Sequence, residues 1–435
     1  MNAENYSDTA SLRNSWAAPQ KKAPIYSVVT LPGSKSLTNR ELVLSALAAE
    51  PTLLTGALAS RDSALMIAAL TSLGSKIEQL DETALRISPL GELNTNAVID
   101  CGLAGTVMRF VPPLAALVNG PVEFDGDAAA RRRPMNITID SLRALGVSVE
   151  DHGTGALPFT VIGTGSIEGG ALTIDASASS QFVSGLLLSA ARFEKGLTLR
   201  HVGEHLPSLP HIEMTLETLR QRGVNAYSPE TAVWRVEPGP IGGGEIAIEP
   251  DLSNAGPFLA AAMVAGGSVT VSGWPDTTTQ VGDEFDGILQ RMGARIERSA
   301  LGLTITGNGN IHGIDIDLSI GGELTPVIAA LAALADSPTR ISGVAHLRGH
   351  ETDRLAALST EINRIGGICR ETADGLEIDP SDNLHGALWH TYEDHRMATA
   401  GAIIGLRVAD IVVEDITTTS KTMPNFAQLW TDMLS

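Results

Sequence analysis

Seven basic residues stand at the starts of predicted helices or in the short loops before them, where they could bind phosphate or carboxylate groups. They are Lys35, Arg40, Arg109, Arg133, Arg354, Arg396 and Lys421. Exposed ion pairs contribute only ~0–1 kcal/mol each, so this arrangement would stabilise the fold poorly. Hydrogen bonds to a bound anion are worth about 1.5–3 kcal/mol each, and arginine can offer two donors to one phosphate. We therefore expect more than one multiply charged anion to bind.

The segment 31–40, Leu-Pro-Gly-Ser-Lys-Ser-Leu-Thr-Asn-Arg, brings two of these cations to one helix start. A β-branched run at 25–30 precedes it and a helical pattern at 41–49 follows it. A helix start offers unpaired N–H groups and the positive end of the helix dipole, which both favour an anion. The spacing is not that of a Walker A loop. Ordinary capping by the serines remains an alternative.

Carboxylates lie among these cations and could exchange protons once ligands neutralise their surroundings. Glu323, Glu351 and Asp394 all stand at predicted helix starts, where complementing the helix dipole is the alternative explanation. His346 and His350 flank this region, but their spacing is not the H-E-x-x-H of a zinc site, and no metal is predicted. The paired serines at 179 and 180 have no evident His and Asp partners in triad order. They indicate phosphate hydrogen-bond donors, or helix caps.

The composition narrows the class of protein. The chain has 435 residues, 43% of them hydrophobic, and a net charge of −20, which opposes nucleic-acid binding. Two cysteines provide neither a disulfide framework nor a metal quartet. No apolar run approaches the roughly 20 residues of a membrane span. Residues 1–20 have no apolar core and are expected to form a loose tail. We expect a cytoplasmic monomer that binds neither membrane nor nucleic acid.

A helix that ends in glycine and leads into a strand pair recurs along the chain. The glycines are Gly74, Gly146, Gly223, Gly293 and Gly366, spaced 72, 77, 70 and 73 residues apart. A sixth copy would end just past the C-terminus, and the strand it lacks is available at 25–30. The pattern predicts six α/β units of the βαβαββ type, the sixth closed by the N-terminal strand.

Two lobes of three units each follow from this repeat. We expect 34–248 to form the N-terminal lobe and 21–33 plus 249–435 to form the C-terminal lobe, with the polar loops of both facing a shared cleft. Mutual repulsion among the cations predicts an open form without ligand and closure when anionic ligands bind.

Seven motifs then occur in a fixed order: Leu31-Pro-Gly-Ser-Lys-Ser36 with Arg40, Ala104-Gly-Thr106 with Arg109, Arg133-Pro134, Ser179-Ser-Gln-Phe182, Glu351-Thr-Asp-Arg-Leu355, Asp394-His-Arg-Met397, and Lys421-Thr422 with Pro424. From about Pro32 to the C-terminus this series resembles the EPSP synthase family. The resemblance implies two inside-out α/β lobes of three repeats each. It also implies transfer of the enolpyruvyl group of phosphoenolpyruvate to the 5-hydroxyl of shikimate 3-phosphate, for aromatic amino-acid biosynthesis, without metal or organic cofactor.

The resemblance also implies roles for individual residues. Those expected to bind shikimate 3-phosphate are Lys35, Ser36, Arg40, Ser179, Ser180, Gln181, Ser208, Glu323 and His350. Those expected to bind phosphoenolpyruvate are Lys35, Gly105, Arg133, Gln181, Arg354, Arg396 and Lys421. The expected catalytic residues are Lys35, Glu323, Glu351 and His395, with Glu323 as base toward the hydroxyl and Glu351 with Lys35 moving the proton of the methylene carbon.

Several positions depart from the family's commoner residues. Leu103 replaces the family's commoner Asn, Phe110 replaces Pro and Glu323 replaces Asp, while His346 and His350 replace Asn and Lys. The sequence therefore does not predict the response to glyphosate, and the histidines make this part of the site sensitive to pH near neutrality.

Two other functions remain as alternatives. One is enolpyruvyl transfer to UDP-N-acetylglucosamine, whose enzymes use a mobile-loop cysteine in the lobe that contains Cys101. Cys101 instead ends a predicted strand. The other is a non-catalytic anion-binding scaffold, which full retention of Lys35, Glu351 and Lys421 opposes.

Overall fold

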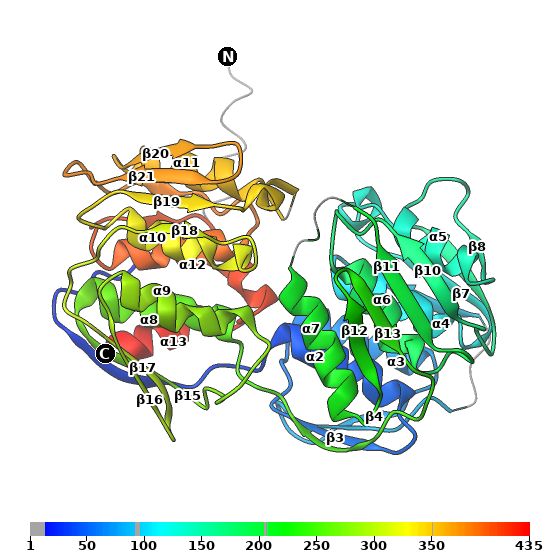
Figure 1. The fold of residues 1–435 in the computed structure, drawn as a ribbon. Coiled ribbons are helices and arrows are strands. Elements are labelled where there is room, and N and C mark those ends of the chain that lie inside the picture. The colour runs from blue at the N-terminus through cyan, green and yellow to red at the C-terminus, as the bar shows by residue number, and fades with distance from the viewer. Residues whose placement is uncertain (1–13, 92–95, 204–205, 207, 350) are drawn as a thin grey trace. The chain divides into compact units, whose positions relative to one another are not determined.

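The chain folds into two compact units (Figure 1). The middle unit comprises residues 32–249, and the terminal unit comprises residues 1–31 with 250–435. The computed structural model describes residues 14–91, 96–203, 206, 208–349 and 351–435. None of the described helices is long and apolar enough to cross a membrane.

The described residues of the middle unit form six helices, one short 3₁₀ turn and three sheets. Its helices are α2 (Lys35–Leu47), α3 (Arg61–Ser72), α4 (Gly105–Ala115), α5 (Asn136–Ala144), α6 (Gln181–Ala190) and α7 (Leu209–Gln221), with η2 (Ala130–Arg132) before α5. Its strands are β3 (Thr52–Thr55), β4 (Ile77–Gln79), β5 (Leu85–Ile87), β6 (Ala97–Asp100), β7 (Asn119–Asp125), β8 (Ser148–Glu150), β9 (Phe159–Thr164), β10 (Gly170–Ile174), β11 (Leu197–His201), β12 (Ala226–Glu230), β13 (Val233–Val236) and β14 (Gly244–Ala247).

The terminal unit repeats this organisation. Its helices are α8 (Leu252–Ala265), α9 (Phe285–Arg291), α10 (Thr325–Ala332), α11 (Arg354–Arg364), α12 (His395–Gly405) and α13 (Phe426–Leu434), with 3₁₀ turns η3 (Val281–Glu284), η4 (Gly322–Leu324), η5 (Ala345–Gly349) and η6 (Ile416–Lys421). Its strands are β1 (Trp16–Ala17), β2 (Ile25–Val29), β15 (Gly267–Ser272), β16 (Arg295–Ser299), β17 (Gly302–Gly307), β18 (Asp315–Asp317), β19 (Thr339–Ser342), β20 (Ile368–Glu371), β21 (Leu376–Asp379), β22 (Leu388–Trp389) and β23 (Val412–Val413).

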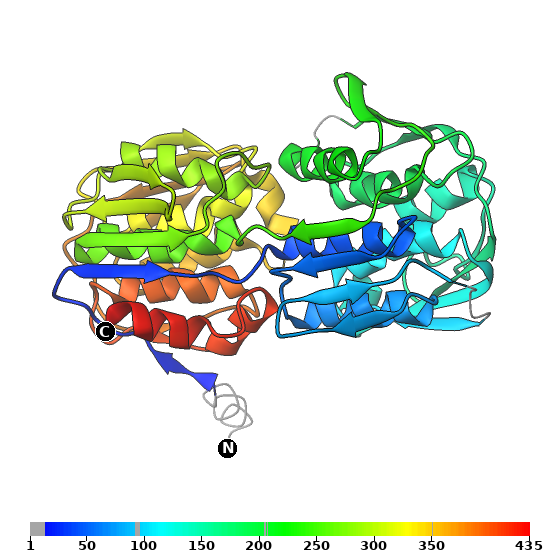
Figure 2. The same cartoon turned by 90° about the horizontal axis from the view of Figure 1, so that it is seen from below.

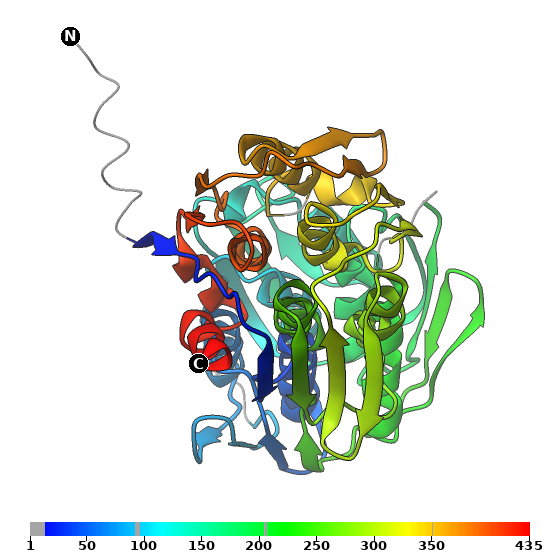
Figure 3. The ribbon, with the colours of Figure 1, turned by 90° about the vertical axis from the view of Figure 1, so that its left-hand side faces the viewer.

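The six sheets share one strand pattern, which confirms the predicted repeats. In each, a parallel pair is followed by an antiparallel partner, as in the order β6-β7-β9-β8. Figure 3 shows β2, β15, β17 and β16 side by side in the terminal unit. In the middle unit β14, a green arrow, lies beside the blue β3 (Figure 2), so the last strand of this unit completes its first sheet.

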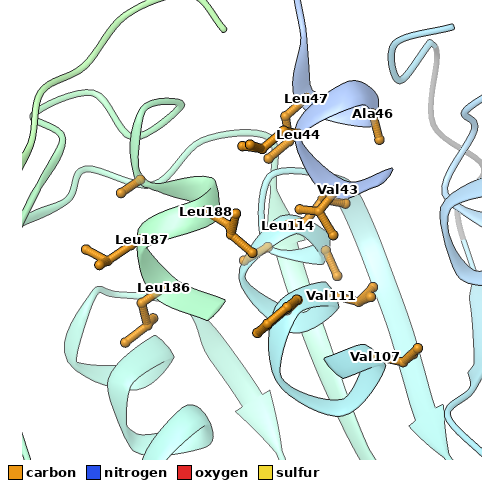
Figure 4. Packing of buried hydrophobic residues seen from close by; sticks show 14 of the residues in the cluster. Val43, Leu44, Ala46, Leu47, Val107, Val111, Leu114, Leu186, Leu187 and Leu188 are labelled. Atoms are coloured by element: carbon orange, nitrogen blue, oxygen red, sulfur yellow. The ribbon is translucent and has the colours of Figure 1, made fainter. Parts of the chain in front are cut away.

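Helices fill the inside of each unit and the sheets lie outside them. In the middle unit α2, α4 and α6 contact one another through side chains such as Val43, Val111 and Leu188 (Figure 4). The close approach of α6 to α4 requires glycine at 185, because a Cβ there would lie 2.2 Å from the carbonyl oxygen of Arg109. Helices α8, α10 and α12 form the matching buried set in the terminal unit. Each unit is therefore an inside-out α/β lobe.

The buried helices of a unit run in the same direction. Arg407, just after α12, donates to the carbonyl oxygens of Val264 (3.0 Å) near the end of α8 and Leu334 (2.9 Å) just after α10. In the middle unit Arg192, just after α6, donates to the carbonyl of Leu47 (2.7 Å) at the end of α2. Since the carboxyl ends meet at an arginine, the amino ends of these helices meet at the opposite end of the unit.

Two expectations about the N-terminal segment are wrong. Residues 1–13 lie outside the described residues, but 14–20 do not form a loose tail, because β1 pairs antiparallel with β23 and Trp16 packs edge-on against Phe426. The sixth sheet lacks a hairpin of its own, and β1 occupies the vacant antiparallel position. Strand β2 packs against the last helix, α13, but it pairs with β15 and so completes the fourth sheet and not the sixth.

The predicted ends of the outer helices are confirmed. Gly74, Gly146, Gly223, Gly293 and Gly366 each have a positive φ, from 80° at Gly223 to 107° at Gly293. Glycine adopts this left-handed conformation without steric cost, which ends a helix and turns the chain into the next strand.

We predict that Arg407→Met lowers the free energy of unfolding of the terminal unit by about 2–4 kcal/mol, because it leaves buried helix-end carbonyls without a charged donor. The guanidinium of Arg407 also donates to the carbonyl of Gly309 (2.6 Å). Tryptophan fluorescence during urea denaturation reports mainly on this unit, since four of the five tryptophans belong to it and only Trp234 lies in the middle unit.

Arg370→Met is the matched control. Its guanidinium pairs with Glu377 and Asp379, but the side chain is 60% exposed, so we expect a change below about 0.5 kcal/mol. Equal midpoints for the two variants would show that Arg407 does not hold the helix ends.

Candidate active site

The amino ends of the buried helices carry most of the residues expected from the sequence, in two groups. One group belongs to the middle unit and the other to the terminal unit.

In the middle unit, Lys35 and Ser36 occupy the first two positions of α2 and are partly exposed. Ser34 caps this helix by accepting a hydrogen bond from the N–H of Leu37, so the proposed capping role belongs to Ser34. Lys35 and Ser36 thus stand at the positive end of the helix dipole.

Arg40 lies one turn further into α2 and is only 2% exposed. Its guanidinium donates to the hydroxyl of Thr215 (2.8 Å) and to the carbonyls of Ser36 (2.8 Å) and His211 (2.9 Å), and it lies over the ring of Phe110. Burial lowers the pKa of Arg40 to about 9, so it remains a cation at neutral pH. Arg40 therefore supplies charge to this end of the unit, while its donors are bonded to the protein.

Gly105, Arg109, Arg133 and Gln181 meet where α4 and α6 begin. A Cβ on Gly105 would lie 3.0 Å from Arg109 Nη1 and Gln181 Oε1 and 3.2 Å from Arg133 Nη1, so any larger residue would push these side chains aside. Arg109 donates weakly to Gln181 Oε1 (3.4 Å). Burial, aided by the charge of Arg133, lowers the pKa of Arg109 to about 9. Two neighbouring cations that repel each other favour an anion between them.

Three serines of the middle unit, at positions 179, 180 and 208, lie at or just before helix starts. Ser179 Oγ accepts from the N–H of Gln181 (3.2 Å) at the start of α6, which is the capping alternative. Ser180 is buried, and Ser208 precedes α7 with a left-handed φ of 56°. Ser179 and Ser208 are partly exposed at helix starts, where a phosphate could bind.

In the terminal unit, Glu351 bridges two cations. Its Oε1 accepts from Lys421 Nζ (2.5 Å) and its Oε2 from Arg354 Nη2 (3.0 Å). Arg354 is 2% exposed, and its Nε donates to the wholly buried carboxylate of Asp394 (2.7 Å). Asp394 was expected only as part of a helix start, and the structure shows it to be the main counter-charge of Arg354.

Glu323 joins the amino ends of α8, α10 and α12. It lies in η4 before α10, accepts a hydrogen bond from Ser253 Oγ at the start of α8, and lies 3.7 Å from Arg396 Nη2 at the start of α12. A Cβ on the adjacent Gly322 would lie 2.5 Å from His346 Nε2, so this histidine borders the same turn. His350 lies outside the described residues.

His395 is buried beside Asp394 at the start of α12, with 3.7 Å between its Nδ1 and Asp394 Oδ1. That nitrogen has no hydrogen-bond partner among the described residues. Burial, together with the charge of Arg396, holds the pKa of His395 well below its usual value. The pKa of His346 is lowered by burial and by Arg354. Both rings are therefore neutral near pH 7.

The thiols do not belong to these groups. Cys101 directly follows β6 and is fully buried, and burial raises its pKa to about 12. Among the described residues no cluster of His, Cys, Asp and Glu could hold a metal ion.

Comparison with known proteins places this arrangement in a family. The sequence profile described as EPSP synthase (3-phosphoshikimate 1-carboxyvinyltransferase) matches residues 19–430. The chain is 56% identical to a 3-phosphoshikimate 1-carboxyvinyltransferase of Kocuria rhizophila, over 96% of both chains. Two structures of EPSP synthase from Acinetobacter baumannii resemble it in fold, with TM-scores of 0.82 and 0.81 at 25% and 24% identity; each covers 96% of this chain, and 97% and 98% of its own. This chain belongs to the EPSP synthase (3-phosphoshikimate 1-carboxyvinyltransferase) family.

Proposed function

We propose that the chain transfers the enolpyruvyl group of phosphoenolpyruvate to the 5-hydroxyl of shikimate 3-phosphate. The hydroxyl oxygen bonds to the central carbon of phosphoenolpyruvate as the methylene carbon gains a proton. The tetrahedral adduct then loses phosphate and a methyl proton, which leaves the enol ether. The observation that carries this proposal is the bridging of Arg354 and Lys421 by Glu351 in a chain of this family.

The bridge gives Glu351 a means of taking up a proton. Its carboxylate is ionised while Arg354 and Lys421 compensate it. A phosphate or carboxylate that binds these two cations supplies competing negative charge, so the proton affinity of Glu351 rises when phosphoenolpyruvate arrives. Glu351, with Lys35, then exchanges the proton of the methylene carbon.

Glu323 is the base toward the acceptor hydroxyl in this proposal. Its carboxylate lies near Arg396 and accepts from Ser253, and both contacts favour the ionised form that a base needs. Neutral His395 contributes hydrogen bonds, because its low pKa keeps it uncharged.

The anion-binding roles follow the two groups. Phosphoenolpyruvate is bound by Arg354, Arg396 and Lys421 of the terminal unit and by Lys35, Gly105, Arg133 and Gln181 of the middle unit. Shikimate 3-phosphate is bound by Ser36, Ser179, Ser180, Gln181 and Ser208, together with Lys35, Glu323 and His350. The buried guanidinium of Arg40 adds positive charge to this site.

The transfer to UDP-N-acetylglucosamine has less support. Its cysteine chemistry needs an accessible thiolate, whereas Cys101 is buried with a raised pKa.

The direct test measures phosphate release from phosphoenolpyruvate by the purified chain, with either shikimate 3-phosphate or UDP-N-acetylglucosamine as acceptor. Release with shikimate 3-phosphate alone is expected. Phosphate release with the nucleotide sugar alone would overturn the acceptor assignment. No release with either acceptor would favour the non-catalytic anion-binding scaffold.

We predict that Glu323→Gln and Glu351→Gln each lower the turnover rate about 10²–10⁴-fold, because each amide can no longer accept a proton. Isolated tetrahedral adduct, mixed with each variant in a rapid-quench experiment, separates the two roles. Unimpaired breakdown of the adduct by both variants would remove both assignments.

Acid should destabilise the fold through His395. The unfolded chain protonates this histidine near pH 6.5, whereas the folded chain keeps it neutral. The unfolded state therefore binds more protons below about pH 6.5, and the free energy of unfolding falls as the pH decreases toward 5. His395→Asn should reduce this slope in urea titrations between pH 5 and 7.5, and an unchanged slope would contradict the assignment.

We propose that shikimate 3-phosphate, to which residues of both units are assigned above, draws the units together. Small-angle scattering should give a smaller radius of gyration with this ligand than without it. Inorganic phosphate at the same ionic strength is the control, and equal radii with and without shikimate 3-phosphate would count against closure.

A further inference from the structure

The loop that leads into α12 holds two successive residues in an unfavourable backbone conformation. Tyr392 and Glu393 have φ angles of 52° and 58°. In residues other than glycine this left-handed conformation is strained, and it persists only where surrounding contacts impose it. The next residues, Asp394 to Arg396, belong to the candidate active site, so the contacts that hold this loop matter for the site.

Glu414 accepts a hydrogen bond from the N–H of Thr391 (3.1 Å), and helix α11 provides further contacts through a second buried carboxylate, that of Glu361. This residue is 0% exposed. It accepts hydrogen bonds from the hydroxyl of Tyr392 (2.7 Å), the backbone N–H of His390 (3.1 Å) and the Nε of Arg364 (3.0 Å). Two of these three donors, the hydroxyl of Tyr392 and the N–H of His390, belong to the strained loop. Glu361 therefore fixes the loop as well as being stabilised itself.

The same helix also holds the other end of the loop. Arg354 lies seven residues before Glu361, which places the two side chains on the same face of α11, two turns apart. Arg354 donates to Asp394, and Asp394 Oδ1 accepts from the N–H of Arg396 (2.8 Å). The loop between β22 and α12 is thus held at 390 and 392 by Glu361 and at 394 by Arg354.

We propose that Glu361 and Tyr392 are positioning residues that fix Arg396 relative to Arg354. Both arginines are assigned above to phosphoenolpyruvate, so the inference rests on the proposed function. Neither Glu361 nor Tyr392 needs to touch the substrate. Their hydrogen bond holds the strained turn, and without it the turn relaxes and the two arginines no longer match the spacing of the ligand's anionic groups.

Tyr392→Phe tests this with little risk to the fold. The side chain of Tyr392 is 36% exposed, and without its hydroxyl Glu361 keeps Arg364 and the N–H of His390. The matched control is Tyr227→Phe. Tyr227, 41% exposed, donates to Glu237 (3.2 Å) on a sheet of the middle unit, so it loses the same kind of hydrogen bond elsewhere.

In steady-state kinetics, Tyr392→Phe should raise the KM for phosphoenolpyruvate about 5–10-fold, with the KM for shikimate 3-phosphate and kcat changed less than about threefold. Glu361→Gln keeps one acceptor oxygen and should fall between the parent and Tyr392→Phe. Tyr227→Phe should match the parent in every parameter. Equal effects on both KM values, or none on that of phosphoenolpyruvate, would overturn the proposal.

Hydrogen exchange provides a readout that does not depend on turnover. The amide of Arg396 should exchange about 5-fold faster or more in Tyr392→Phe than in the parent, while Tyr227→Phe leaves it unchanged. If the parent releases no phosphate with shikimate 3-phosphate, the proposed function fails and this measurement alone decides on the positioning. Unchanged exchange would then exclude it.

Discussion

The parallel direction of three buried helices in each unit is the constraint on which the site depends. Their carboxyl ends meet, as Arg407 shows by binding carbonyls near the ends of α8 and α10. Their amino ends must then meet as well, and in the terminal unit they do so at Glu323. Unpaired N–H groups and the positive ends of several helix dipoles are thereby concentrated in one place. An anionic ligand is the natural partner of that arrangement.

The two units compensate this positive charge in different ways. In the terminal unit, Arg354 and Lys421 share Glu351, and Arg354 also pairs with Asp394. In the middle unit, no ion pair joins Arg40 or Arg109 to a carboxylate among the described residues, and burial lowers the pKa of both to about 9. Two buried cations that lack a bonded carboxylate favour an anion nearby. In the terminal unit the cations are bonded to carboxylates, which suits the proposed proton transfer.

Local sequence signals predicted the elements well and their partners less well. The glycines that end the outer helices and the polar loops that begin the inner ones require only local conformational preferences, so both were visible in the sequence. The pairing of β2 with β15 was mispredicted, because both candidate sheets accept a β-branched strand of that length. The ordering of residues 14–20 was missed because two-residue β1 carries no periodic pattern of its own.

By itself, the sequence determined the six-fold repeat, the positions of the cations at helix starts and the motif series of the family. Each of these depends on residues close together in the chain. Tertiary structure alone decided which group each buried carboxylate binds: Asp394 pairs with Arg354 and Glu361 binds Tyr392, across 40 and 31 residues. Hydrogen bonds of this kind depend on packing distances of a few ångströms between separate helices, and residue spacing along a chain does not specify such distances.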